Sequence, residues 1–219
     1  MEAMRISSIN VGRAESLDRG ERSVVTGIYK LAVAGPVRVL ESGVEGDTVC
    51  DLDNHGGADQ AVYAYATEHY AWWSQELGRE LEFGSFGENL TISGFVDDLQ
   101  AGDRLLVGDV ILEATAPRIP CSTLAVRMGD AGFGLRFRQA VRPGVYFRVL
   151  NEGQISPGDP VTLVENPGES VSMLEIFRAW FQPRPAPAEL ERIVSAPVAE
   201  RVREKFERLR EVGGSAARA

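Results

Sequence analysis

The chain contains few of the residues that build disulfide scaffolds or zinc sites. Its 219 residues include two cysteines, Cys50 and Cys121, and two histidines. Two cysteines cannot form a disulfide framework, and these two lack the paired spacing of a zinc site. No run of about 18 apolar residues occurs, and residues 1–10 lack the basic and apolar blocks of a signal peptide. We therefore expect a cytoplasmic protein that has no membrane partner.

The chain as a whole lacks an excess of positive charge, since 23 basic residues face 32 acidic ones. The formal net charge is -9 and the sequence pI is about 4.9. No general basic field is therefore available to attract a nucleic acid polymer, and a small-molecule substrate is favoured instead. At this length the chain suits one domain, or one domain with a small appendage.

Short β-branched segments separated by glycine turns fill most of the chain. We expect strands at 5–11, 23–28, 30–40, 61–65, 105–107, 110–114, 146–150 and 161–164, and a loop at 12–20. This spacing favours a mainly β fold with an antiparallel, barrel-like sheet and a few short helices. One helix should begin after a cap at Thr67 and end at Gly78, with Tyr70 and Trp73 in the core and His69 on the surface.

The pattern changes at Asn166-Pro167-Gly168, which predicts a β-barrel domain at 1–166 and a small three-helix domain at 167–219. Ser172 and Glu175 form a capping box that opens the first helix, and Pro197 suits the first turn of the third. The third helix has an apolar stripe made by Val198, Val202, Phe206, Leu209 and Val212. Packing on the barrel or on a second copy in a homodimer would bury this stripe.

Arginine, in contrast, is concentrated between residues 118 and 148. This stretch has one acid, Asp130, and six arginines: Arg118, Arg127, Arg136, Arg138, Arg142 and Arg148. Arginine makes planar, bidentate contacts with phosphate and carboxylate groups. In an otherwise acidic chain, this local excess predicts a site for a small anion.

Cys121 lies in the same stretch, before a short apolar run that ends at Gly129. Pro120 disfavours helix in the residue before it, and Ser122 is a candidate helix cap. At a helix N-terminus, unpaired N–H groups lower the pKa of a thiol and favour the thiolate, which is the form that binds metals. A free cysteine is more often a small buried hydrophobe, and both interpretations of Cys121 are open, although the arginines favour the reactive one.

A polar, glycine-rich loop at 43–59 is a second candidate for function, because a rigid scaffold can aim such a loop. It contains Asn54, His55, Gly56, Gly57 and Asp59. Two glycines beside an imidazole let backbone N–H groups approach a ligand, but a backbone hydrogen bond explains the imidazole equally well. Farther on, Glu88 and Asn89 enter a strand, where the amide either binds a cofactor oxygen or closes the turn.

Five short motifs, in this order along the chain, resemble the MOSC domain family. They are Asp51-x-x-x-His55-Gly56-Gly57-x-Asp59-x-Ala61, Glu68-His69-Tyr70, Gly87-Glu88-Asn89-Leu90-Thr91, Pro117-Arg118-x-Pro120-Cys121 and Gly144-x-Tyr146-Phe147-Arg148-Val149. The resemblance spans roughly residues 5 to 165, and the helical tail is similar to a three-helix domain found in one bacterial branch of the family. Asn54 and Val145 depart from it, since relatives commonly carry histidine and tryptophan there.

The resemblance implies a β-barrel that holds molybdenum cofactor, a pyranopterin whose dithiolene binds the metal. It makes Cys121 the protein ligand to molybdenum, which a soft thiolate suits. Arg118, Arg142 and Arg148 become candidates for the cofactor phosphate or the metal oxo groups. His55, Glu88 and Asn89 become candidates for pterin binding or proton delivery, so that Cys121 and His55 are the catalytic candidates. Asn54, Gly56, Gly57 and Asp59 complete the candidate cofactor-binding set.

Family members of this kind look like enzymes that reduce N-hydroxylated compounds, such as hydroxylamines and N-hydroxylated bases, by oxygen-atom transfer. A reductase partner would supply the two electrons. An alternative is a non-catalytic carrier of the cofactor, or of sulfur as a persulfide on Cys121. Only Lys30 and Lys205 are available to hold pyridoxal phosphate, and neither lies in a suitable segment. A third hypothesis is a barrel that binds some other anion without chemistry.

Overall fold

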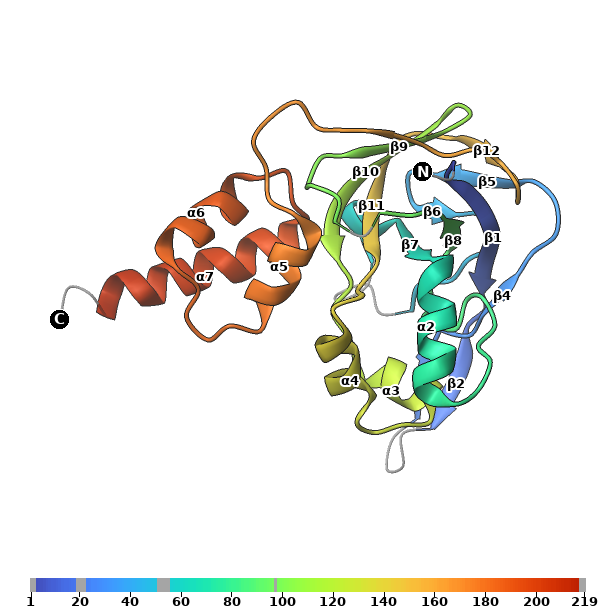
Figure 1. Ribbon diagram of the computed structural model, residues 1–219, viewed down its shortest axis with the longest axis horizontal. Coiled ribbons are helices and arrows are strands. Elements are labelled where there is room, and N and C mark those ends of the chain that lie inside the picture. The colour runs from blue at the N-terminus through green and yellow to red at the C-terminus, as the bar shows by residue number, and fades with distance from the viewer. Residues whose placement is uncertain (1–2, 19–22, 51–55, 97, 217–219) are drawn as a thin grey trace.

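Eight strands form the main sheet of the computed structural model, which describes residues 3–18, 23–50, 56–96 and 98–216. In spatial order they are β13 (Thr162–Val164), β9 (Arg104–Val107), β10 (Val110–Pro117), β11 (Val145–Asn151), β7 (Val62–Ala66), β8 (Leu90–Ser93), β1 (Arg5–Gly12) and β4 (Lys30–Ala32) (Figure 1). The β7 and β8 pair is parallel, and the other neighbours are antiparallel.

The two edges of this sheet approach each other at one corner. The ladder runs from β13 to β4, but the start of β1 also bonds the segment that leads into β13. Ile6 N donates to Asp159 O at 3.0 Å, and Val161 N donates to Met4 O at 2.9 Å. These bonds satisfy backbone groups that would otherwise be an open edge.

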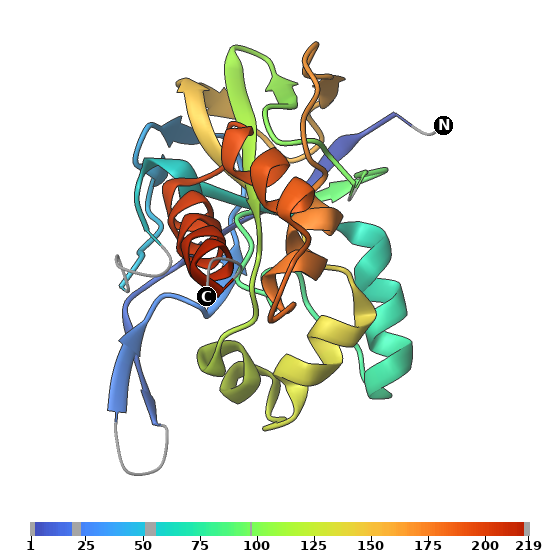
Figure 2. The same cartoon turned by 90° about the vertical axis from the view of Figure 1, so that its left-hand side faces the viewer.

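Two smaller sheets complete the strand content. One contains β12 (Gly153–Ile155), β5 (Val37–Leu40) and β6 (Gly43–Val44), and the other is a hairpin of β2 (Glu15–Asp18) and β3 (Ser23–Thr26). The hairpin extends away from the rest of the molecule (Figure 2). The expected loop at 12–20 was therefore wrong, because Ser16 and Leu17 pair with the β-branched Val25 and Val24.

Helices contribute nearly as much as strands, since 30% of the chain is helical and 31% is extended. The fold is therefore mixed and sheet-rich, and "mainly β" describes it too narrowly. The helical elements near the sheet are η1 (Ala58–Gln60), α2 (Thr67–Leu77), α3 (Ser122–Met128) and α4 (Phe133–Ala140). None of the helices in the described ranges has the length and apolar character that a membrane span requires.

Helix α2 ends as predicted at Gly78, which adopts φ 63°. Its cap differs from the prediction, because Ala66 is the N-cap residue and the Thr67 hydroxyl bonds the Ser7 hydroxyl at 3.0 Å. Tyr70 and Trp73 are buried as expected, but the surface placement of His69 was wrong. Its side chain packs edge-on against Tyr65 and is 4% exposed.

Three helices follow the strands: α5 (Met173–Trp180), α6 (Pro187–Ser195) and α7 (Glu200–Ala216). They lie together at one end of the molecule (Figure 1). The capping box is confirmed, since the Ser172 hydroxyl accepts from Glu175 N at 3.1 Å. Phe177 of α5 packs edge-on against Phe137 of α4, with ring centroids 6.3 Å apart. The division into domains at residue 166 stays a prediction.

Pro197 does not lie in the first turn of α7, which begins at Glu200. The chain before the helix is held against the sheet instead, because Ala199 N donates to Thr115 O at 2.9 Å. The apolar stripe is buried at Val198, Val202 and Phe206 but not at Val212, whose side chain is 70% exposed.

Phe86 lies at the centre of the largest aromatic cluster of the core. It is fully buried, and its ring centroid is 4.5 Å from that of Tyr65, 5.8 Å from Trp73 and 6.2 Å from Phe137. These contacts join β7, α2 and α4. The backbone of Phe86 also supports the site described below.

We predict that Phe86→Ala lowers the free energy of unfolding by about 3–5 kcal/mol, because a large cavity is left in a core that cannot fully collapse. Leu31→Ala is the control, since Leu31 is 64% exposed and should change stability by less than about 0.5 kcal/mol. Urea unfolding measures both. Equal midpoints for the two variants would contradict the central role of this ring.

Candidate functional site

A cavity of about 340 Å³ is lined on one side by β3 of the hairpin and on another by β7 and β11 of the main sheet. Its wall comes from segments far apart in sequence: residues 24–28, residues 47–50, β7, β11 and the start of α3. The volume lies within the usual range for small-molecule sites. Cys121 and Arg118 lie side by side on this wall.

Cys121 is the N-cap residue of α3, with extended backbone at φ -118° and ψ 166°. The predicted cap, Ser122, is instead the first helical residue, and the helix ends at Gly129 as expected. The thiol is half-buried. Sulfur is thus presented to the cavity at a helix start, as the sequence predicted.

Arg118 is almost fully buried, with 4% exposure, and its guanidinium holds the sulfur in place. Nη2 donates to Cys121 Sγ at 3.6 Å, and Nη1 donates to Phe86 O at 3.1 Å. Gly87 makes the second bond possible, because it turns the chain at φ 76° directly after Phe86.

Burial disfavours the charge on Arg118, but its pKa is raised because nearby Tyr146 and Cys121 favour the charged form more strongly. The guanidinium therefore remains a cation. Arg118 Nε has no hydrogen-bond partner in the part of the chain that the structure describes. The same holds for Nε2 of Gln60, another residue of the cavity wall. Both orphaned atoms are donors, which suits an acceptor-rich ligand.

Lys30 and Asp47 form a buried ion pair that also lines the cavity. Asp47 also accepts from Gly12 N at 2.7 Å and from Asn89 Nδ2 at 2.8 Å. Burial lowers the pKa of Lys30, and the adjacent carboxylate opposes that effect. Asn89 lines the cavity, but its amide is committed to protein groups, since Oδ1 accepts from Tyr63 N at 3.1 Å. Asn89 therefore positions Asp47.

Glu88 lies behind the wall and is completely buried. Oε1 accepts from Gly84 N and Thr91 Oγ1, both at 2.8 Å, and from the Tyr70 hydroxyl. Oε2 has no hydrogen-bond partner among the residues described. Burial raises the pKa of this carboxyl, and the three hydrogen bonds only partly oppose it.

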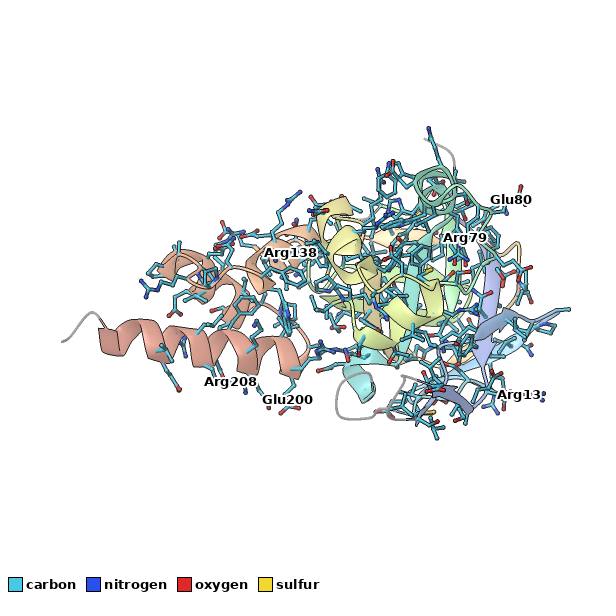
Figure 3. All side chains as sticks on the ribbon, turned by 90° about the horizontal axis from the view of Figure 1, so that it is seen from below. Arg13, Arg79, Glu80, Arg138, Glu200 and Arg208 are labelled. Carbon is cyan, nitrogen blue, oxygen red and sulfur yellow. The ribbon has the colours of Figure 1, made fainter. Side chains whose placement is uncertain are left out.

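The six arginines that are close in sequence are not close in space. Arg127 lies over the Tyr29 ring, Arg136 pairs with Asp130, and Arg138 lies over Phe181 between α4 and the C-terminal helices (Figure 3). Arg142 contacts His69 Nδ1 at 2.9 Å and lies over the Trp72 ring. Within the described ranges, Arg118 is the one member of this group on the cavity wall.

Arg148 joins Asp59 to the sheet rather than to the cavity. It lies 3.0 Å from Asp59 Oδ1 and 3.8 Å from Glu113 Oε1. Asp59 Oδ2 in turn accepts from the backbone N of Glu200 at the start of α7. Gly57, at φ 90°, precedes η1, and Gly56 and Gly57 are not on the cavity wall. Asn54 and His55 lie outside the described residues, so their predicted roles stay predictions.

Sequence reasoning did not assign to the site several residues of the wall that have polar side chains, among them Lys30, Asp47, Gln60, Tyr63 and Tyr146. Three of them carried a usable signal. Lys30 is one of two lysines, and Tyr146 lies in the Gly-x-Tyr-Phe-Arg motif beside Arg148. Asp47 follows Gly46 in the polar loop. Nothing local in the sequence shows that these groups face Cys121.

The side chains of the cavity wall do not form a metal site by themselves. In the described part of the chain, no group of three or more His, Cys, Asp or Glu side chains is arranged to hold a metal ion. A metal at Cys121 must therefore bring most of its ligands with it. The second cysteine, Cys50, also lines the cavity, but the residue as a whole is exposed. Partial burial of its thiol and the nearby Asp47 raise the pKa of Cys50.

Comparison with known proteins agrees with the motifs. The model of the MOSC domain matches residues 51–162. YflK of Bacillus subtilis is 34% identical over 195 residues, which cover 89% of this chain and 88% of YflK. The crystal structure of YiiM from Geobacillus stearothermophilus is similar with a TM-score of 0.79 and 33% identity, covering 94% of this chain and 99% of YiiM.

A third relative is much longer than this chain. A protein named "Reductase" from Gibberella moniliformis is 35% identical over 160 residues. The match covers 71% of this chain but 28% of that protein.

We predict that stability falls as pH rises from 4.5 through the raised pKa of Glu88, because in that range the folded state holds a proton that the unfolded chain releases. Glu88→Gln mimics the protonated acid and should remove this part of the pH dependence. The measurement is the urea midpoint of both proteins between pH 4 and pH 9. Parallel curves would show that Glu88 is ionised in the folded protein.

Proposed function

Because the chain belongs to the MOSC domain family, we propose that it is a molybdenum cofactor-dependent oxidoreductase that reduces N-hydroxylated compounds to amines. One observation carries the proposal: a half-buried cysteine sulfur on a cavity wall lies 3.6 Å from a buried guanidinium. A soft thiolate is a suitable ligand for such a metal, and a fixed cation next to it favours the thiolate.

The residues present fit this cofactor. It brings dithiolene ligands of its own, so that a single thiolate, Cys121, suffices from the protein. The orphaned donors at Arg118 Nε and Gln60 Nε2 suit its phosphate and oxo oxygens. Lys30 adds a second cation on the same wall. Arg142 and Arg148, engaged elsewhere, contribute to the packing of α2 and of α7 instead.

Bound at Cys121, the cofactor supplies an acceptor for the substrate oxygen and a store for two electrons. Reduction of a hydroxylamine consumes two electrons and two protons and releases an amine and water. The protein binds and orients the substrate in the cavity. Arg118 donates a hydrogen bond to the sulfur, and the buried Lys30–Asp47 pair adds fixed charges to the cavity wall.

The source of the electrons is proposed from the relatives. The "Reductase" from Gibberella moniliformis contains a region similar to this chain, and that region makes up 28% of the longer protein. We propose that in the present protein the electrons come from a separate reductase partner in the cytoplasm. The exposed Val212 of α7 leaves an apolar position for a second copy in a homodimer.

The architecture that we propose for this function is a MOSC-type β-barrel with a three-helix appendage. The bonds between β1 and residues 158–161 support closure of the main sheet. The grouping of α5, α6 and α7 at one end supports a separate appendage (Figure 1).

We predict that Cys121→Ser lowers the molybdenum content from about one per chain to near zero, because the serine hydroxyl is a poor soft ligand. Reductase-dependent turnover of N-hydroxylated compounds should disappear with it. Elemental analysis and amine formation are the measurements.

Cys50→Ser is the matched control, since this cysteine lines the same cavity but is exposed. It should keep both molybdenum and turnover. Wild-type protein from a molybdenum-replete host that contains no molybdenum would refute the proposal. Transfer of labelled sulfur from Cys121 without substrate reduction would show a carrier instead.

A further inference from the structure

Four tyrosines are buried in the core, and three of their hydroxyls are used by the protein. Tyr63 donates to Pro143 O at 2.8 Å, Tyr65 accepts from Trp73 Nε1 at 2.8 Å, and Tyr70 bonds Glu88. The fourth, Tyr146, is 7% exposed and lines the cavity, and its hydroxyl makes no hydrogen bond to another side chain or backbone group of the described residues. Because Tyr146 lines the cavity, its hydroxyl can bond a ligand without giving up a bond within the protein.

Tyr146 lies on the cavity wall, next to the two groups that the proposed function uses. It sits on β11 opposite Tyr63 of β7, and the two ring centroids are 4.9 Å apart. Both residues line the cavity, as do Arg118 and Cys121. The charges of Arg118 and Cys121 are close enough to act on the Tyr146 hydroxyl.

We propose that the Tyr146 hydroxyl binds the oxygen atom of the substrate N–OH group and thereby selects N-hydroxylated compounds over the corresponding amines. This inference rests on the proposed function, because it assigns a substrate to the same cavity. The residue would touch the atom that leaves the substrate, so its role is recognition at the reacting centre.

The chemistry of the phenol agrees with a donor role. Burial raises the pKa of Tyr146 and outweighs the opposite effect of Arg118, so the hydroxyl keeps its proton. The N–OH oxygen is an acceptor that the product amine lacks. A site that hydrogen-bonds a substrate hydroxyl rejects the analogue without it, because its own polar group is then left unpaired. Because the product amine lacks this oxygen, it binds more weakly than the substrate and is released more readily.

The test compares two ligands that differ by one oxygen atom, phenylhydroxylamine and aniline. Their binding to the oxidised, molybdenum-loaded protein is measured by calorimetry without reductant, so that no turnover occurs. Wild type should prefer phenylhydroxylamine. Tyr146→Phe should weaken that ligand about tenfold, as expected for one lost hydrogen bond, while aniline binding and molybdenum content stay unchanged.

Tyr63→Phe is the matched control. It removes a hydroxyl from the same cavity wall, but one that already donates a hydrogen bond to Pro143 O. It should lower the thermal midpoint but keep the ligand preference. Tyr146→Phe should keep the midpoint, since it breaks no bond within the protein.

Three results would overturn the assignment: an unchanged preference in Tyr146→Phe, a loss of molybdenum from that variant, or no preference in wild type. The loss of molybdenum would mean that the hydroxyl serves the cofactor. Failure of the proposed function is seen separately, as wild-type protein without molybdenum. In that case the same calorimetry on the metal-free wild type and Tyr146→Phe decides whether the hydroxyl binds the N–OH group.

Discussion

The fold and the site depend on a buried positive charge at Arg118. A buried cation is costly unless hydrogen bonds and opposite charge surround it. Arg118 satisfies this condition through Phe86 O and Cys121 Sγ, and its guanidinium lies 5.5 Å from the Tyr63 ring centroid. Phe86 is also the centre of the aromatic core. Phe86 therefore supports the packing of β7, α2 and α4 with its side chain, and it fixes the Arg118 guanidinium with its backbone carbonyl.

The part of the site that the sequence could predict is the part that is local. Cys121 and Arg118 are three residues apart at the end of β10 and the start of α3, so their contact follows from a single turn of chain. The other arginines illustrate the limit. They lie on α3, α4, β11 and the loop before β11, and each contacts a different partner, such as Tyr29, Phe181 or His69, so nearness in sequence did not become nearness in space. The pairing of Lys30 with Asp47 requires the β1 and β4 register, which no motif encodes.

Element types were easier to predict than their ends and environments. The strands and helices follow from β-branched runs, capping boxes and terminal glycines, as at Ser172 and Gly78. His69 was misplaced because its burial depends on Arg142, which lies 73 residues away. The start of α7 was misplaced because the backbone N–H of Ala199 bonds Thr115 of the sheet, and the helix begins only after it, at Glu200. Tertiary contacts overruled local preference at both places.

One wall of the cavity is built from the β2–β3 hairpin, through Val24, Val25 and Thr26. In the described residues this hairpin shares no ladder with another strand, and Val25 is 61% exposed. Tyr63 and Tyr146, in contrast, line the cavity from β7 and β11 of the main sheet, and both are buried. Substitutions in the hairpin can therefore change the shape of the cavity, and with it the choice of ligand, without disturbing Arg118 or Cys121.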